Sequence, residues 1–257
     1  MILLDPDARP VIGHRGNRAH APENTLPSLL EAVALGVDAV EFDLHLSKDG
    51  VLVLMHDATL DRTTDAKGPV ASRTAAELRD VDAGARFSRN GRDFPWRGKR
   101  VGVPTFDEVI DALPATLPLI IELKTAAATS MLQAAIARHK LAGRIIVAGF
   151  DPESTRPLRG GNVALGASQP EAAGLVVPAL LRRPVAASWY HALCIPPAHI
   201  GIPVPVGAIV RTMRPHRIPT HIWTVNSASH AHRLWRKGVN GIISDDPGLI
   251  LASRSGG

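Results

Sequence analysis

Two acidic residues stand two positions apart in one short apolar run. Glu41 and Asp43 alternate with apolar residues over positions 39–44. Side chains two positions apart on a strand share a face, so we expect both carboxylates to point into one interior. Buried carboxylates repel each other unless a cation lies between them, and oxygen ligands suit Mg²⁺ or Ca²⁺. Glu122, in the apolar run at 119–123, is the natural third ligand.

Two basic residues accompany these acids. Arg15 follows the apolar run at 11–13, and Lys124 follows the run that contains Glu122. Salt bridges to them are the alternative to a metal, but we favour the metal because three carboxylates outnumber two cations. A guanidinium fork and an ammonium also suit the binding of phosphate, and both roles are compatible. Gly16 would relieve crowding where the chain leaves the strand.

A pair of histidines lies at the ends of apolar runs. His14 closes the run at 11–13, and His56 closes the run at 51–55. Imidazole titrates near neutral pH, so we expect this pair to perform general acid–base catalysis. His45 shares the face of Glu41 and Asp43, but its offset places it further out. The other eight histidines are expected to be surface or structural residues.

Short apolar runs and helix-like segments alternate along the chain, and polar residues close the runs. Eight strands are expected at 11–13, 39–44, 119–123, 145–148, 163–165, 192–195, 221–225 and 241–243. Helices are expected at 25–35, 106–113, 131–139, 152–159, 171–181, 206–213, 229–237 and 247–253, with Asn24 and Thr105 as two of the caps. Eight β-then-α units predict a (β/α)₈ TIM barrel, in which chemistry occurs at the C-terminal ends of the strands.

Two further segments complete the expected fold. The run at 51–55 follows Asp49-Gly50 and predicts a hairpin with the second strand. Residues 58–103 are rich in turn signals and predict a small insertion after the second strand, with one short helix near 74–79. We expect one domain over residues 1–257, and the prolines near 178–197 make the fifth and sixth units the weakest predictions.

Composition excludes several classes of protein. The 257 residues carry a formal charge of +5, but the basic residues are scattered and aromatic residues make up 4%, so nucleic-acid binding is not expected. The single cysteine, Cys194, excludes an internal disulfide. No signal peptide and no membrane-spanning run is expected, which predicts a cytoplasmic protein without stable membrane insertion, as a monomer or homodimer.

Six ordered motifs resemble the glycerophosphodiester phosphodiesterase family. They are HRG at 14–16, APENT at 21–25, ExD at 41–43, KDGVLVLMHDATLDRTT at 48–64, ELK at 122–124 and, near the end, WTVN at 223–226 with GIISDDP at 241–247. The resemblance covers nearly the whole chain and is weakest at 176–202. Ser47 and Ser244 stand where threonine is common in the family, and both changes are conservative.

The resemblance implies hydrolysis of glycerophosphodiesters to sn-glycerol 3-phosphate and an alcohol, in lipid and glycerol metabolism. It implies a divalent metal on Glu41, Asp43 and Glu122, and an acid–base pair formed by His14 and His56. Arg15 and Lys124 would hold the phosphate. Trp223 would form a wall against the glycerol or the leaving group, unless it serves only barrel packing. The nucleophile would be water or the neighbouring glycerol hydroxyl, with a cyclic phosphate intermediate in the second case.

Three alternatives follow from the same residues. A lysophospholipase D would use this chemistry with an apolar groove at the rim, for which Phe150, Trp189 and Leu193 are candidates. A catalytically silent barrel that binds phosphodiesters would lack a histidine or a carboxylate, and none is missing. An amidohydrolase barrel would need an HxH pair on the first strand, which His14-Arg15-Gly16 does not supply.

Overall fold

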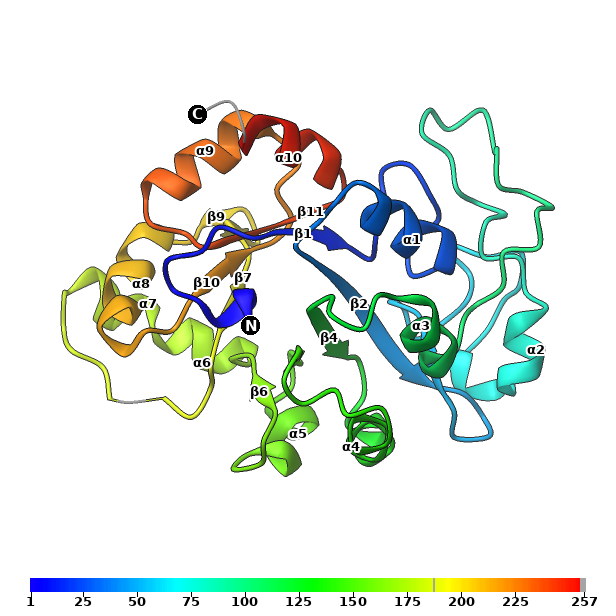
Figure 1. Ribbon diagram of the computed structural model, residues 1–257, viewed down its shortest axis with the longest axis horizontal. Helices are drawn as coiled ribbons and strands as arrows, with labels where there is room; N and C mark the ends of the chain where they lie inside the picture. Colours follow the sequence, from blue (N-terminus) through cyan, green and yellow to red (C-terminus); the bar gives the residue numbers. More distant parts are fainter. Residues whose placement is uncertain (187, 255–257) are drawn as a thin grey trace.

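A computed structural model describes residues 1–186 and 188–254, and it contains a curled parallel sheet of eight strands (Figure 1). The strands are β1 (Val11–His14), β2 (Ala39–Leu46), β4 (Leu119–Leu123), β5 (Ile145–Ala148), β6 (Ala164–Leu165), β7 (Leu193–Ile195), β10 (Thr220–Ile222) and β11 (Gly241–Ser244). They are paired in the order β6-β5-β4-β2-β1-β11-β10-β7. A parallel bridge between Gly166 and Ala192 joins the two outer strands. The predicted (β/α)₈ architecture is therefore confirmed. The last three residues of the predicted domain, 255–257, lie outside the described residues.

Helices surround the sheet in Figure 1. They are α1 (Leu26–Ala34), α2 (Ala75–Arg79), α3 (Phe106–Ala112), α4 (Thr129–Arg138), α5 (Pro152–Thr155), α6 (Gln169–Gly174), α7 (Val176–Leu180), α8 (Val206–Met213), α9 (Ala228–Arg236) and α10 (Pro247–Arg254). Short 3-10 turns occur at η1 (Ile2–Leu4), η2 (Val70–Ser72), η3 (Ala126–Ala128), η4 (Arg156–Leu158) and η5 (Arg214–His216). None of the helices in these described segments is long and apolar enough to cross a membrane.

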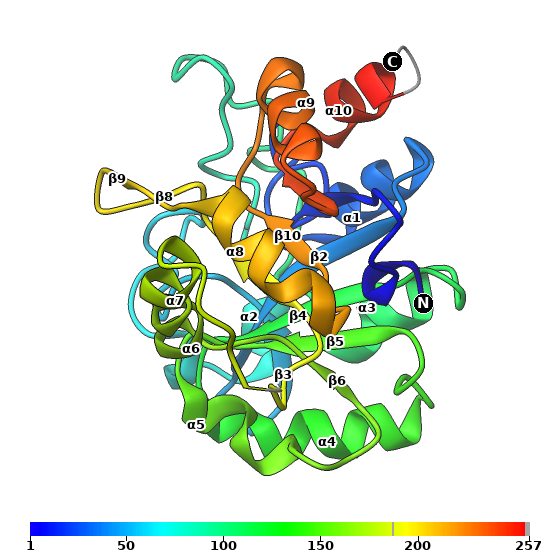
Figure 2. The same ribbon diagram turned by 90° about the vertical axis from the view of Figure 1, so that its left-hand side faces the viewer.

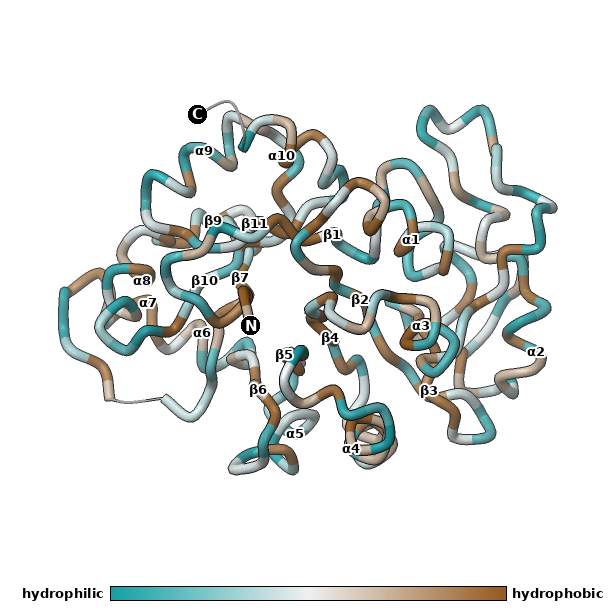
Figure 3. The backbone as a smooth tube through the Cα atoms, in the orientation of Figure 1, coloured by the Kyte–Doolittle hydropathy of each residue, from teal (hydrophilic) through white to brown (hydrophobic). Residues whose placement is uncertain are grey.

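Strand β2 shows how the alternation of the sequence builds two layers. Val40, Phe42 and Leu44 are fully buried in the cluster that β2 shares with α1, α3 and α4. The alternate residues Glu41 and Asp43 face the barrel interior, as the sequence predicts. Figure 3 shows the same contrast along the chain, with hydrophobic strands and more hydrophilic outer helices.

The N-terminal turn closes one end of the barrel. Leu3 of η1 is fully buried with interior residues of the strands, among them Ile12 and Ile120. The ring of His221 on β10 lies 2.9 Å from the Leu3 carbonyl through Nε2, so this buried histidine is structural. In Figure 2 the N-terminus lies on the opposite side from α7 and the hairpin that follows β7. The C-terminal ends of the strands therefore form the open end.

The predicted hairpin and insertion are both present. β3 (Leu52–Leu54) pairs antiparallel with β2, with Leu54 opposite Leu44. The insertion has a small apolar cluster of its own, in which Leu60, Val70 and Leu78 pack against Val53. Its helix α2 begins with a capping box formed by Thr74 and Glu77. Another capping box, of Thr105 and Glu108, starts α3 as predicted.

Three expected elements differ from the structure, and one hairpin of the structure was not expected. The helix expected at 171–181 is two helices, α6 and α7, because Pro178 lacks an N–H and fits only the first turn of a new helix. The helix expected at 152–159 is the short α5 followed by η4. The strand expected at 221–225 is β10, which ends at Ile222. The hairpin of β8 (Ala198–His199) and β9 (Ile202–Pro203) follows β7 and was not expected.

The predicted cap of α1 is also wrong. Thr25, not Asn24, is the N-cap residue, and its hydroxyl accepts from the Ser28 N–H. Asn24 has a positive φ of 57°, and its side chain reaches into the barrel instead.

Candidate active site

Strand register brings the predicted residues together at the C-terminal end of the barrel. His14 on β1 lies opposite Glu41 on β2, and Asp43 on β2 lies opposite Glu122 on β4. Three carboxylate oxygens, one from each of the three acids, lie within 4.8 Å of one another. Neighbouring strands that carry acids at matching positions therefore deliver one cluster, which we call the carboxylate cluster (Glu41, Asp43 and Glu122).

Burial and mutual repulsion shift the pKa values of the acids in this cluster. Burial, together with the charges of Asp43 and Glu122, holds the pKa of Glu41 well above its ordinary value. Burial and the Asp43 charge raise the pKa of Glu122 to about 7. Burial also disfavours ionised Asp43, but the charges of Lys124 and Arg15 outweigh it and lower the pKa of Asp43. Extra positive charge at this position would allow all three acids to ionise.

The cations of the site contact the same acids. Arg15 Nε lies 3.0 Å from one oxygen of Asp43, and Lys124 Nζ lies 2.9 Å from the other. Lys124 also contacts Glu122, and the Arg15 backbone N–H donates to Glu41 over 3.0 Å. Both cations and the carboxylate cluster thus share one small volume, so the salt bridges considered from the sequence are present.

The donor set fits a divalent cation such as Mg²⁺ or Ca²⁺. Carboxylate oxygens are the ligands that these hard cations prefer. Within the described part of the chain, the buried Oδ1 of Asp43 accepts no hydrogen bond of good geometry, although Lys124 Nζ is close. A lone pair of Asp43 is therefore available to a metal, beside two carboxylates whose pKa values are raised by burial and by the neighbouring negative charges.

His14 is held by an acid from the last strand. Its Nδ1 lies 2.6 Å from Oδ1 of Asp245, which follows β11, and its Nε2 lies 3.9 Å from Glu41. Asn226 donates to the other oxygen of Asp245 over 2.9 Å. Burial opposes ionisation of Asp245, but the hydrogen bond from His14 and nearby positive charge lower its pKa to about 2. An ionised carboxylate only accepts, so Nδ1 carries the proton and Nε2 faces the cluster.

His56 repeats this arrangement from the other side. Its Nδ1 lies 2.6 Å from Oδ1 of the next residue, Asp57, and Arg62 Nε donates to the second oxygen of Asp57 over 2.6 Å. Burial lowers the pKa of His56 despite the charge of Asp43. A histidine with a lowered pKa is neutral near pH 7, which is the form that accepts a proton.

Glu23 links the site to the insertion. Its carboxylate accepts from Arg15 over 2.7 Å, from Arg18 over 2.8 Å and from Arg62 over 2.7 Å. Burial opposes the ionisation of Glu23, but Arg62, Arg15 and Arg18 together lower its pKa. Arg62 belongs to the insertion, so the insertion fixes both Glu23 and the Asp57 partner of His56.

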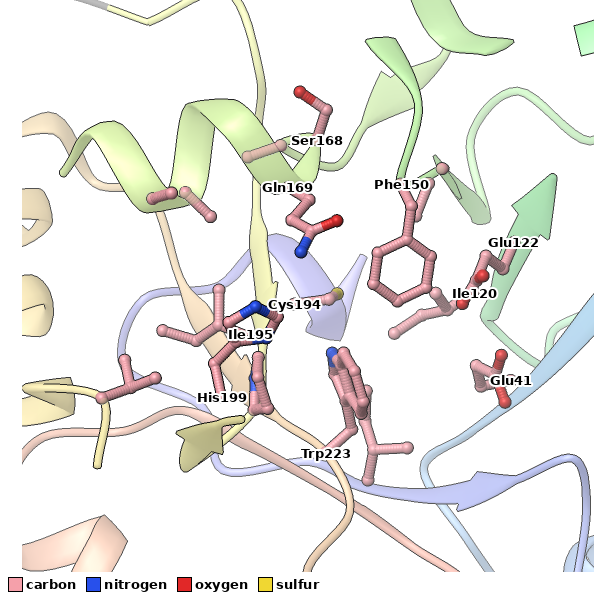
Figure 4. Close-up of a pocket in the computed structure, with 18 of the residues that line it drawn as sticks. Glu41, Ile120, Glu122, Phe150, Ser168, Gln169, Cys194, Ile195, His199 and Trp223 are labelled. Carbon is pink, nitrogen blue, oxygen red and sulfur yellow. The ribbon is translucent and has the colours of Figure 1, made fainter. Parts of the chain in front are cut away.

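A cavity of about 260 Å³ opens beside these groups (Figure 4). His14, His56, Glu41 and Glu122 line one end of it. Trp223, which follows β10, lines it too and meets Phe150 edge to face with ring centroids 5.8 Å apart. The site therefore has a charged end and an aromatic wall.

A model of the "Glycerophosphoryl diester phosphodiesterase family" matches residues 14–249. The chain belongs to this family.

Curated relatives agree with the assignment. A glycerophosphodiester phosphodiesterase of Caldanaerobacter subterraneus is 32% identical over 259 residues, which cover 96% of this chain and 98% of the relative. A glycerophosphodiester phosphodiesterase of Bacillus subtilis is 32% identical over 274 residues, which cover 99% of this chain and 89% of the relative. The chain is therefore similar to these enzymes over nearly its whole length, and the family assignment makes it a phosphoric diester hydrolase.

Solved structures share the fold. The glycerophosphoryl diester phosphodiesterase domain of an uncharacterized Mycobacterium tuberculosis protein superposes with a TM-score of 0.86 at 22% identity, covering 98% of this chain and 100% of that domain. An Oleispira antarctica phosphodiesterase, in complex with its product sn-glycerol-3-phosphate, has a TM-score of 0.76 at 25% identity, covering 96% and 97%.

Several residues of this phosphodiesterase site were not predicted from the sequence. Asn24 donates to Asp43 over 2.8 Å, and Asp245, Asp57, Glu23 and Arg62 hold the histidines and arginines described above. All five lie in the family motifs APENT, HDATLDRTT and GIISDDP, so membership in a motif was the available signal. His45 lies beside the site, with Nε2 3.3 Å from the His56 carbonyl.

Proposed function

We propose that this chain hydrolyses glycerophosphodiesters to sn-glycerol 3-phosphate and an alcohol, with a divalent cation on Glu41, Asp43 and Glu122 and with His14 and His56 as the acid–base pair. The observation that carries the proposal is the convergence of three carboxylates and two carboxylate-bound histidines on one cavity. The product named in the Oleispira antarctica structure supports the same reaction.

The cation, Mg²⁺ or Ca²⁺, would supply positive charge to the phosphate oxygens when bound. Arg15 and Lys124 line the cavity beside the cluster, so they are positioned to bind phosphate oxygens. Glu23 orients Arg15 for this task through a 2.7 Å hydrogen bond. Preorganised positive charge of this kind is the main electrostatic requirement of phosphoryl transfer.

The two histidines divide the proton transfers. His56 accepts the proton of the nucleophile, because its lowered pKa keeps it neutral. His14, in its doubly protonated form, donates the Nε2 proton to the leaving alkoxide, while Asp245 fixes the ring through the Nδ1–H group. Trp223 and Phe150 form the wall that confines the diester. A cytoplasmic location and a monomeric or homodimeric state stay predictions from the sequence.

The test is an assay of alcohol release from a panel of glycerophosphodiesters with choline, ethanolamine, glycerol and inositol groups. Activity should disappear after chelation and return on addition of Mg²⁺ or Ca²⁺, and the second product should be sn-glycerol 3-phosphate. Activity that survives thorough chelation would show that the reaction does not require a divalent cation. Binding of the diesters without turnover would indicate a silent binding barrel instead. Accumulation of a cyclic phosphate would identify the substrate hydroxyl as nucleophile.

A further inference from the structure

The cavity continues beyond the aromatic wall into an apolar arm. We use this name for the part lined by Ala172, Val176, Ile195, Val204 and Ile209. These residues come from α6, α7, β7, the segment after β9, and α8. In Figure 4, Phe150 and Trp223 lie between the carboxylates on one side and Ile195 and His199 on the other. One space therefore joins a phosphodiester site to a hydrocarbon-lined chamber.

The lining of this arm selects against small polar alcohols. Glycerol or ethanolamine in the arm would lose hydration without regaining hydrogen bonds, except to Gln169 or His199. Choline binds best where aromatic faces surround its ammonium group. The described lining of the arm beyond Phe150 and Trp223 is mainly aliphatic. A hydrocarbon chain gains by burial here, since apolar surface removed from water stabilises a complex in proportion to its area.

Two segments that line the arm also carry the most exposed apolar side chains of the described residues. Val177, Leu180 and Leu181 are 63%, 60% and 57% exposed, and Ile200 and Ile202 are 87% and 70% exposed. No other large apolar side chain in segments 1–186 and 188–254 exceeds 46%. The five residues lie on or beside α7 and on the β8–β9 hairpin, and both of these segments also line the arm.

The position of this exposed surface favours contact with lipid. The β8–β9 hairpin projects from the body of the molecule on the same side as α7 (Figure 2). Exposed Arg182 and Arg183 directly follow Leu181. Apolar tips flanked by arginines suit insertion between anionic lipid head groups. Isolated exposed apolar residues are common, but these five lie on two segments that also contribute Val176 and His199 to the lining of one apolar cavity.

We propose that the substrate class of this site is a lysophospholipid, a glycerophosphodiester with one hydrocarbon chain, taken from a lipid surface. The proposal rests on the proposed phosphodiesterase function. The hydrocarbon chain of the lysophospholipid occupies the apolar arm, while its phosphate lies at the carboxylate cluster. A water oxygen bonds to phosphorus, the bond between phosphorus and the head-group oxygen breaks, and the proton lost by water is delivered to the leaving alkoxide. The products are an acylated glycerol phosphate and the head-group alcohol.

The first experiment compares glycerophosphocholine with monomeric lysophosphatidylcholines of increasing chain length, by choline release in the presence of Mg²⁺ or Ca²⁺. We expect kcat/KM to rise by roughly tenfold for every two methylenes buried until the arm is full. A kcat/KM that stays level or falls with chain length would overturn the substrate class while leaving the phosphodiesterase function intact. Absence of alcohol release from every choline, ethanolamine, glycerol and inositol diester of the panel would instead refute the proposed function.

A variant tests whether the apolar arm binds the hydrocarbon chain of the substrate. Ala173 is exposed on α6 and lines the cavity, so Ala173→Trp should narrow the arm without disturbing the core. We expect the ratio of lysophosphatidylcholine to glycerophosphocholine turnover to fall by about tenfold or more. Ala137→Trp, at an exposed alanine of α4 outside the cavity lining, is the matched control and should keep the wild-type ratio. Equal ratios in both variants would show that the hydrocarbon chain of the substrate does not occupy the arm.

A second variant tests the source of the lipid. Ile200→Ser combined with Ile202→Ser should weaken co-sedimentation with phosphatidylcholine–phosphatidylglycerol vesicles by about fivefold or more. The ratio of turnover on vesicle-embedded lysophosphatidylcholine to turnover on the short-chain monomer should fall in parallel. Met131→Ser, on α4 and 44% exposed in the native chain, is the control and should bind like the wild type. Wild-type vesicle binding by the hairpin variant would overturn the lipid surface as the source.

Discussion

At the scale of single residues, the two histidines of the site are alike in their support and different in their surroundings. Each has Nδ1 on a carboxylate at 2.6 Å and lines the cavity. The side chain of His14 is 9% exposed, whereas the side chain of His56 is 34% exposed beside the insertion. The proposed acid–base pair thus consists of one buried imidazole and one that is partly open to solvent.

Removal of either imidazole should stop most of the turnover. His14→Ala and His56→Ala should each lower kcat by roughly 10²-fold or more, the usual scale for losing acid–base assistance. His230→Ala on the outer helix α9 is the control, because His230 does not line the cavity. Steady-state choline release measures all three variants, and a near-normal rate would withdraw the catalytic role from that histidine.

Asp245 should make stability depend on pH. Its pKa is lowered from 3.8 to about 2, so its native interactions stabilise the fold above about pH 4 and are lost as the pH falls through about 2. The stability difference between wild type and Asp245→Asn should therefore shrink by about 2 kcal/mol between pH 5 and pH 2. Urea unfolding of both proteins at a series of pH values measures this difference. The contributions of the other acids are the same in both proteins and therefore cancel. A constant difference would contradict the assignment.

Residues with alternating neighbours were predictable, and residues bound only through tertiary contacts were not. Glu41, Asp43 and Glu122 lie on strands whose apolar neighbours fix their direction, so the sequence places them on one face. Asp245 meets His14 across 231 residues, and nothing in local periodicity encodes that contact. Asn24 was assigned as a helix cap because caps and buried amide partners use the same residue type.

At the scale of elements, the turn from β1 into α1 sets the geometry of the site. Gly16 has a φ of +89°, and a Cβ there would collide with the carbonyl group of Ser28. The predicted need for glycine at this point is confirmed. The same turn places Arg15, with a φ of 50°, between Glu41 and Asp43.

Substitution of Gly16 separates backbone strain from crowding. Gly16→Ala should destabilise the protein by about 3 kcal/mol, because a positive φ and a steric collision add. Gly36→Ala is the matched control, since Gly36 has a φ of +80° but open space around its Cα, and it should cost about 1 kcal/mol. Chemical denaturation measures both, and equal losses would show that backbone strain alone matters at Gly16.

Elements with one dominant pattern were predicted well, and elements interrupted by proline were not. The capping boxes of α2 and α3 mark their first residues in the sequence. The region 176–202 contains several prolines, and its α6–α7 break and β8–β9 hairpin depend on packing against α8 and on turn geometry. Val176 and His199 of that region line the apolar arm, which is where the sequence was least informative.

At the scale of the whole molecule, the carboxylate cluster is an energetic cost that a cation would relieve. Three buried acids lie together at the open end of a barrel whose other end is closed by Leu3. Binding of Mg²⁺ or Ca²⁺ to the native state should therefore raise its stability as well as its activity.

Thermal unfolding provides this test without an activity readout. At a cation concentration of 100 Kd, the free energy of unfolding should increase by about 2.7 kcal/mol, with a matching rise in Tm. Glu122→Gln should abolish most of the rise, whereas Glu153→Gln, at an exposed acid of α5, should preserve it. An equal rise in both variants would mean that the cation binds elsewhere.

The barrel itself was predictable because its strand and helix units recur in order along the chain. The bridge between Gly166 and Ala192 that joins the two outer strands was not predictable, since a single bridge leaves no pattern in the sequence.

The pairing of β1 with both β2 and β11 has a consequence for synthesis on the ribosome. The first strand emerges early, but one of its edges stays without a partner until residues 241–244 have been made. Until then, Val11 and Ile12 present an open edge of the kind that chaperones shield. The contact between His14 and Asp245 can form only after residue 245 has been made, so a nascent chain cannot orient the His14 ring before that point.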